Sequence, residues 1–403
     1  MIRFLIKGRR TVFSLMVLLF IFSHPAFSQT TNPNLRIRAQ SALLMDALSD
    51  QVLYEQNPQL KIAPASFSKI LTLYLAFDNL RDGHLKMDDR VVISKKAWRI
   101  GGSKMFIQIG EKVKVEDLLK GIAIVSGNDA CVALAEHIAG SEDSFVAKMN
   151  EKAKRLGLKD SQFKNAHGMP AEDQYVTALD MAILAKYYIK DHPEALPFHS
   201  TPEFEYNGIR QSNRNLLLRR GIGVDGLMTG YVEKSGYHLL ATAKREGQRM
   251  IAIVMGCDKL QRRYQEGQAL LEYGFKNFST VEVVKENALV GPQKVIRGKV
   301  GQIQLVTAED VWGTVSKGKE NTISTTKILP KYLIAPIKKG QVVGKLVIQS
   351  EGKVLKEIDL LSSSDVPKGV PLFWLLIGGG MLGLILTGLI AFLRLRRYHR
   401  KKF

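Results

Sequence analysis

Hydrophobic residues recur every three or four positions along much of the first two thirds of the chain, which predicts a series of helices. The predicted helices cover residues 64–77, 115–138, 142–156, 177–189 and 264–275. Two apolar runs, 236–243 and 250–255, have the pattern of strands joined by a turn at 245–248, and a further hairpin is predicted at 42–54. The length of the chain allows one large and one small domain, and we assign these helices and hairpins to the large one, at residues 29–278.

From about residue 281 the helical pattern stops and short alternating runs take over. Hydrophobic and polar residues alternate over 302–306, 342–348 and 354–360, with Gly, Pro and Asn between the runs. This pattern predicts a small all-β domain over residues 279–364.

The first 28 residues have the pattern of a secretory signal peptide. Four basic residues precede an uncharged apolar run at 12–22, and the small residues Ala26 and Ser28 stand at the positions that a signal peptidase reads. An uncleaved membrane anchor is the alternative, but the run is short for a bilayer span. Under either interpretation the body of the protein is exported.

The other end of the chain has the pattern of a membrane anchor. Residues 372–393 carry no charge and would reach about 33 Å as a helix, enough to cross a bilayer. Six basic residues follow, and such a cluster stays on the cytoplasmic side. We therefore expect a transmembrane helix at 371–393, a cytoplasmic tail at 394–403 and the large domain at 29–278 outside the cytoplasmic membrane. The glycines at 378–380 and 383 are a candidate packing face for a homo-oligomer.

A formal net charge of +20 is typical of a nucleic-acid-binding protein, but here it is spread over segments that are expected to lie in different compartments. The signal segment carries four of these charges and the tail six, so ten remain on the exported body. No basic stripe with interleaved aromatic residues is present, which argues against nucleic acid as a partner. Cys131 and Cys257 lie in apolar surroundings and are predicted to be free, buried thiols.

Ser66 and Lys69 form the first candidate catalytic pair. Three positions apart on a predicted helix, their side chains share a face, so the amine can take the hydroxyl proton as the serine attacks a carbonyl carbon. The helix N-terminus adds positive potential where an oxyanion develops. Taken alone, the pair is more simply interpreted as a helix cap and a solvated lysine.

Two further polar segments change that interpretation. Ser126-Gly127-Asn128 interrupts the second predicted helix, where a second hydroxyl and an amide that binds substrate can lie. Residues 224–230 then open the predicted strand pair. Three such segments in this order indicate a serine acyl-transfer site.

Together these segments resemble the catalytic boxes of low-molecular-weight penicillin-binding proteins, specifically the D-alanyl-D-alanine carboxypeptidases of peptidase family S11. The S-x-x-K box lies at 66–69, the S-x-N box at 126–128 and the K-T-G box at 228–230. The segments that contain Ser103 and His167 are also similar to that family, and the resemblance spans residues 35–361. It implies an α/β penicillin-binding or β-lactamase-like transpeptidase fold, in which helices flank a five-stranded antiparallel sheet.

The resemblance implies that Ser66 is the acylated nucleophile, Lys69 its general base and Ser126 the residue that passes a proton to the leaving D-alanine. The expected substrate is a peptidoglycan stem peptide ending in D-Ala-D-Ala. A β-lactam mimics that dipeptide and is expected to bind covalently at Ser66. Water would then hydrolyse the acyl-enzyme. No cofactor is implied, and the histidines lack metal-ligand spacing, so no metal is expected.

The expected substrate-binding residues are Asn128, Met228, Thr229, Gly230 and Tyr231. By resemblance, Asn128 would hold the substrate amide and Thr229 the terminal carboxylate. The backbone amides of Ser66 and Tyr231 would form the oxyanion hole.

Met228 is a departure, because the family has a lysine there. At 4 Å and an effective dielectric of 20, one charge pair is worth about 4 kcal/mol before desolvation, or up to a few powers of ten in turnover. Methionine cannot supply this charge, so Lys234 and Arg263 are candidate replacements.

Three functions remain open at this point. The main hypothesis is an active carboxypeptidase in which another cation replaces the missing lysine, because the other motif residues are present. The second is a peptidoglycan-binding or penicillin-binding scaffold with little turnover, which Met228 alone supports. The third is a serine β-lactamase, which needs a deacylating carboxylate, and Glu172 is a poor candidate. Rapid release of an acylating β-lactam would distinguish the third.

Overall fold

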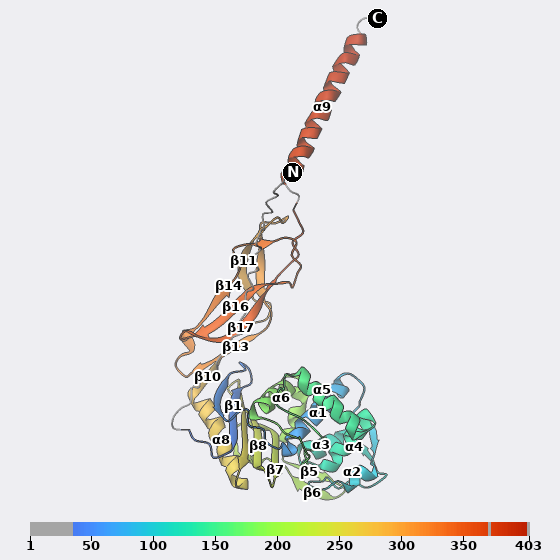
Figure 1. Ribbon diagram of the computed structural model, residues 1–403, viewed down its shortest axis with the longest axis vertical. Coiled ribbons are helices and arrows are strands. Elements are labelled where there is room, and N and C mark those ends of the chain that lie inside the picture. The colour runs from blue at the N-terminus through green and yellow to red at the C-terminus, as the bar shows by residue number, and fades with distance from the viewer. Residues whose placement is uncertain (1–34, 370–371, 401–403) are drawn as a thin grey trace, which may run out of the picture.

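The computed structural model describes residues 35–369 and 372–400, without the side chains of 372–379, 395 and 397–400. The predicted signal peptide at 1–28 lies outside the described residues. Figure 1 shows an α/β domain at one end, a β domain next to it and a long helix beyond the β domain.

An antiparallel five-stranded sheet with the order β2-β1-β9-β8-β7 forms the centre of the α/β domain, which confirms the expected fold. Its strands are β1 (Ser41–Asp46), β2 (Val52–Gln56), β7 (Val224–Val232), β8 (Gly236–Arg245) and β9 (Gln248–Cys257). The predicted hairpin at 42–54 is the pair β1 and β2, and the predicted strand pair is β8 and β9. The third motif lies on the edge strand β7.

Strand β9 shows that both faces of the sheet are covered. Ile251 and Ile253 enter the core shared with the helical lobe, whereas Ala252 and Val254 enter the core beneath α8 (Leu260–Asn277). Successive strand side chains point to opposite faces, so this alternation buries the sheet on two sides. The sheet is therefore held rigidly between α8 and the helical lobe.

The helical lobe contains the first two motifs. Its helices are α1 (Ser68–Arg81), α2 (Lys95–Arg99), α3 (Val115–Ala123), α4 (Asn128–Ala139), α5 (Glu142–Arg155), α6 (Ala178–Asp191) and α7 (Leu196–Ser200). Short strand pairs complete it: β3 (Arg90–Val92) with β4 (Lys112–Lys114), and β5 (Glu203–Tyr206) with β6 (Ile209–Ser212). Every residue of α1 from Ser68 to Phe77 is buried, so this helix is the centre of the lobe. Cys131 and Cys257 are free and buried, as predicted.

The β domain is built around a six-stranded sheet with the order β14-β16-β17-β12-β11-β15, beside the pair β10 and β13. Its strands are β10 (Phe278–Val284), β11 (Leu289–Ile296), β12 (Gln302–Thr307), β13 (Val311–Ser316), β14 (Ile323–Ile328), β15 (Leu333–Ile334), β16 (Val342–Ser350) and β17 (Lys353–Ser362). It has its own hydrophobic core, which includes Val311, Ile348 and Leu360.

Hydrogen bonds join the β domain to the turn between β1 and β2. Ser49 Oγ lies 2.6 Å from Thr314 Oγ1 in a buried contact, and the Thr280 hydroxyl donates to the Asp46 carboxylate. Gln248 Nε2 donates to the same threonine at 2.8 Å. These contacts fix the β domain to the end of the sheet where β1 ends and β9 begins. The last residue of α8, Asn277, is followed directly by β10.

The chain continues into α9 (Leu372–Arg400), where a transmembrane helix is expected. Among the described residues, no helix is both long and apolar enough to cross a membrane. That part of the expected fold is therefore unsupported.

Candidate active site

Ser66 lies in the 3₁₀ turn Ala65–Phe67 that leads into α1. Its Oγ accepts hydrogen bonds from Lys69 Nζ at 3.2 Å and from Ser126 Oγ at 2.8 Å. Ala65, immediately before it, has a positive φ of 48°, an unusual conformation that turns the chain sharply ahead of the helix. Ser66 is half-buried and lines a cavity of about 1490 Å³, so its hydroxyl is accessible to a substrate.

Lys69 is buried at 1% exposure, one turn into the helix from Ser66. Besides Ser66, its ammonium donates to Asn128 Oδ1 at 2.7 Å and to the His167 carbonyl at 2.6 Å. All three acceptors are uncharged. Burial lowers the pKa of Lys69 to about 8, although nearby Cys131 and Asp129 oppose that shift. The site therefore holds an amine that loses its proton far more easily than an exposed lysine.

Ser126 and Asn128 lie at the break between α3 and α4. Ser126 has a positive φ of 60°, which turns its hydroxyl out of the helical path and toward Ser66. Asn128 accepts from Lys69 through Oδ1 and donates from Nδ2 to the Gly101 carbonyl at 2.7 Å. One N–H of this amide is thus engaged by the protein, so Asn128 positions Lys69 as well as lining the cavity.

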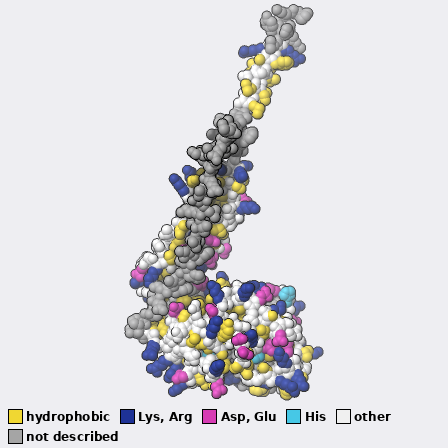
Figure 2. Space-filling view, viewed as in Figure 1, with side chains coloured by type: hydrophobic (Ala, Val, Ile, Leu, Met, Phe, Trp, Pro, Cys, Tyr) yellow, Lys and Arg dark blue, Asp and Glu magenta, His cyan; other side chains and the backbone are white. Residues whose placement is uncertain are grey.

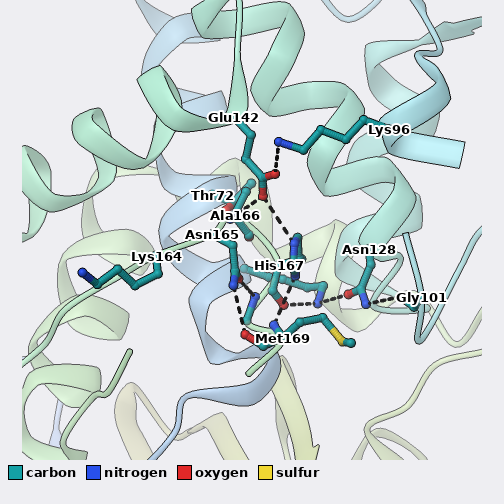
Figure 3. Close-up of polar contacts among 12 residues, drawn as sticks. Thr72, Lys96, Gly101, Asn128, Glu142, Lys164, Asn165, Ala166, His167 and Met169 are labelled. Carbon is teal, nitrogen blue, oxygen red and sulfur yellow. Dashed lines mark hydrogen bonds and ion pairs between the residues drawn. The ribbon is translucent and has the colours of Figure 1, made fainter. Parts of the chain in front are cut away.

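His167 contacts Lys69 through its backbone carbonyl, and Figure 3 shows its ring facing Glu142. Its Nδ1 accepts from the Met169 amide at 3.1 Å, which leaves the proton on Nε2, 3.3 Å from Glu142 Oε1. Burial lowers the pKa of His167 to about 4, with Glu142 opposing, so the ring is neutral near pH 7. Its backbone carbonyl, rather than its ring, contacts Lys69.

Glu142 and Lys96 were not predicted as part of the site. Glu142 accepts from the Ala166 amide at 3.1 Å and pairs with Lys96 at 2.8 Å, so it fixes the loop whose His167 carbonyl contacts Lys69. In the sequence it looks like an ordinary acidic residue in the first turn of a helix. Only the packing of α5 against the loop reveals its role.

On the opposite wall, Thr229, Gly230 and Tyr231 of β7 line the cavity. Gly230 packs against the turn Ala65–Phe67 that contains Ser66. A Cβ added at Gly230 would be 2.8 Å from Ala65 Cβ and 3.4 Å from the Ser66 amide nitrogen. The oxyanion-hole role of the Ser66 and Tyr231 amides stays a prediction.

Met228 was expected to bind substrate, but its side chain does not lie where a substrate could contact it. It is 3% exposed, belongs to the core of the helical lobe and does not line the cavity in the described part of the chain. Its role in substrate binding is therefore unsupported, because an apolar side chain at this position packs inward.

Four basic residues line the cavity: Lys61, Arg214, Lys234 and Arg263. Arg263 donates to the Gly230 carbonyl at 3.0 Å and to the Tyr264 hydroxyl at 2.7 Å. These two bonds fix its guanidinium next to Gly230 of β7. Lys234 and Arg263 were expected candidates, whereas Arg214 was not. The cavity therefore carries positive charge without a lysine at 228.

Two family models match the chain. The model described as D-alanyl-D-alanine carboxypeptidase, peptidase S11, matches residues 27–259, and the model described as penicillin-binding protein 5, C-terminal domain, matches residues 278–368. This chain belongs to the peptidase S11 family. The carboxypeptidase DacC of Escherichia coli strain K12 is 39% identical over 360 residues, which cover 87% of this chain and 90% of that protein. The carboxypeptidase DacF of Bacillus subtilis strain 168 is 38% identical over 364 residues, 87% of this chain and 92% of that protein.

Solved structures agree with these matches. Penicillin-binding protein 5 from Haemophilus influenzae has a TM-score of 0.80 at 38% identity and covers 83% of this chain and 99% of its own. Penicillin-binding protein D2 from Listeria monocytogenes, in its ampicillin-bound form, has a TM-score of 0.56 at 30% identity, over 60% of this chain and 99% of its own.

Gly168 provides a test of the loop that holds Lys69. A Cβ at this position, where φ is +84°, would lie 1.6 Å from the Ala65 carbonyl oxygen. We expect Gly168→Ala to displace the Ser66 turn and to slow acylation by a fluorescent penicillin by about 100-fold. The matched control is Gly157→Ala, which has a similar φ of +79° but open space around its Cβ. Equal acylation rates in the two variants would contradict the role of this contact.

Proposed function

We propose that this chain is a serine-type D-Ala-D-Ala carboxypeptidase, which removes the terminal D-alanine from peptidoglycan stem peptides. The observation that carries the proposal is the buried Lys69 amine 3.2 Å from Ser66 Oγ, with Ser126 Oγ 2.8 Å from the same oxygen. A nucleophile, a base of lowered pKa and a second hydroxyl at these distances are the parts that acyl transfer requires. Membership of the S11 family supports the choice of substrate.

The reaction follows from this arrangement. Neutral Lys69 accepts the Ser66 proton as Oγ attacks the carbonyl carbon of the penultimate D-alanine. Ser126 then donates its hydroxyl proton to the amide nitrogen of the terminal D-alanine, which leaves as the free amino acid. Ser126 regains a proton from the Lys69 ammonium, which returns to its neutral form. Water attacks the resulting ester, and Ser66 recovers its proton as the shortened peptide leaves. A β-lactam forms the same ester at Ser66, but its leaving group stays attached.

The scaffold alternative is not favoured. Its support is Met228, but other cations line the cavity, and the charges of Arg214 and Arg263 make the electrostatic potential there more positive for a bound carboxylate. The lysine, serine and asparagine contacts around Ser66 are all in place. Glu172 is an exposed residue at the wall of the cavity, with no hydrogen bond to Ser66 or Lys69 in the described part of the chain, which argues against a β-lactamase.

The protein is further proposed to be exported and anchored at the outer face of the cytoplasmic membrane. The signal-like residues 1–28 and the uncharged residues 372–393, followed by a basic tail, support this location. With α9 in the bilayer, the β domain would hold the catalytic cavity away from the membrane surface, as the arrangement in Figure 1 suggests. Because glycines allow membrane helices to pack closely, those at 378–380 and 383 support a homo-oligomer formed through the anchor, which is also part of the proposal.

Release of D-alanine from diacetyl-Lys-D-Ala-D-Ala tests the proposed activity. We expect the parent protein to release D-alanine and Ser66→Ala to release none, because the nucleophile is lost. Met228→Lys and fluorescent penicillin labelling are measured alongside. Labelling of the parent without release, together with turnover restored by Met228→Lys, would instead establish a scaffold disabled at that position.

Membrane extraction tests the proposed anchor. The full chain should stay in the membrane pellet after alkaline carbonate washing, whereas a version that ends at residue 369 should be released, because about 20 apolar residues hold a helix in a bilayer. Release of both versions would refute the anchor and leave the activity proposal unaffected.

A further inference from the structure

A second cavity, of about 760 Å³, adjoins the catalytic one. It lies at one end of the sheet, where β1 begins and β2 and β9 end. Arg36, Arg38 and Arg262 line it, and Asp258 is its only acidic lining residue in the part of the chain that the structure describes. The proposed carboxypeptidase mechanism uses none of these residues.

Two of these arginines have no acidic partner among the described residues. Arg262 pairs with Asp258 at 2.8 Å, but Arg36 and Arg38 are exposed and form no ion pair there. A guanidinium offers a planar fork of donors that suits a carboxylate. The cavity therefore presents two unpaired groups of the type that binds an acidic ligand.

The backbone that carries the arginines is held in place. Gln56 Nε2 donates to the Ala39 carbonyl at 2.8 Å, and Asn57 Nδ2 donates to the Gln40 carbonyl at 2.9 Å. These bonds fix the segment after Arg38 to the end of β2. The segment that carries the two arginines is thus anchored immediately after Arg38.

The two cavities are neighbours, because Gln40 lines both of them. Its side chain lies over Gly256, where an added Cβ would be 2.6 Å from Gln40 Cγ. The catalytic cavity reaches Gln40 by way of the turn at 232–235, between β7 and β8. The shared Gln40 thus offers a path for a peptide from Ser66 past this turn to the arginines.

The chemistry sets the direction in which a substrate would follow that path. With the terminal carboxylate near Thr229 and the reacting carbonyl at Ser66, the rest of the peptide must leave on the other side, past Tyr231 and toward the 232–235 turn. Three further residues span up to about 10 Å. A peptide with a free side-chain or α-carboxylate within that stretch would bring it within reach of the arginines.

We propose that Arg36 and Arg38 bind a free carboxylate of the stem peptide upstream of its D-Ala-D-Ala end. The inference rests on the proposed carboxypeptidase function and adds to it a preference for acidic substrates. Anionic lipid headgroups or wall phosphates offer similar chemistry. Continuity with the catalytic cavity through Gln40 favours the substrate.

Two pentapeptides of stem composition test the proposal, one with a free glutamate carboxylate and one with that group amidated. For the full chain in detergent we expect kcat/KM to be about fivefold higher on the acidic peptide, mainly through KM, as expected for a partly exposed ion pair used in binding. Combined Arg36→Ala and Arg38→Ala should remove that preference and leave turnover of the amidated peptide unchanged. The matched control is Lys148→Ala with Lys154→Ala, which removes the same charge from exposed positions on α5.

Several outcomes would overturn the proposal. They are an unchanged preference in the arginine variant, an equal loss on both peptides, and the same loss in the lysine control. Binding of phosphatidylglycerol vesicles is measured in parallel, and a loss confined to the vesicles would assign the arginines to lipid instead.

Direct binding separates this inference from the proposed function. Fluorescence anisotropy with labelled pentapeptides on the Ser66→Ala protein should show tighter binding of the acidic form, and the arginine substitutions should abolish the difference. If the parent released no D-alanine, the proposed function would fail, while this binding difference would still decide whether the arginines recognise the carboxylate. Equal binding of both peptides would refute the inference.

Discussion

The burial of the Lys69 amine is the constraint on which the rest of the site depends. An exposed lysine with a pKa near 10.5 is uncharged in about one molecule in 3000 at pH 7, whereas a pKa of about 8 raises that fraction to about one in ten. The gain comes from surrounding the amine with neutral acceptors: a hydroxyl, an amide and a backbone carbonyl. A carboxylate in direct contact would stabilise the ammonium and reverse the effect.

Holding those neutral acceptors in place requires contacts from elements far apart in the chain. The His167 carbonyl lies on a loop that Glu142 holds in place by accepting a hydrogen bond from the Ala166 amide. Lys96 on α2 forms an ion pair with Glu142 and balances the charge of that carboxylate. Asp129 accepts from the Met105 and Phe106 amides at 3.0 Å, which ties the start of α4 to the loop beyond Gly101. The charged residues Glu142, Lys96 and Asp129 thus hold the surrounding segments in place without a hydrogen bond to the Lys69 amine. Figure 2 shows charged side chains of both signs spread over the visible surface of the α/β domain, whereas Lys69 is buried.

Much of this site could be predicted from the sequence, because its key pair is local. Ser66 and Lys69 share a helix face by spacing alone, and the Ser126 segment stood out as a polar break in an apolar stretch. The antiparallel sheet followed from the family resemblance and from the apolar runs that form β8 and β9. Glu142, Lys96 and Arg214 were missed because their contacts depend on how loops and helices pack, which periodicity does not encode. Met228 was assigned to the substrate by its place in a motif, but its side chain packs into the core.

The pH dependence of Ser66 acylation tests most directly whether neutral Lys69 is the base. The rate constant for fluorescent penicillin would be measured on the parent from pH 6 to 10, with Lys69→Arg as a variant that stays protonated throughout. Because the base acts only without its proton, the parent rate should rise about tenfold per pH unit below a pKa of about 8 and level off above it, and Lys69→Arg should not be acylated. A parent rate already maximal at pH 6, or one still rising at pH 10, would contradict the account.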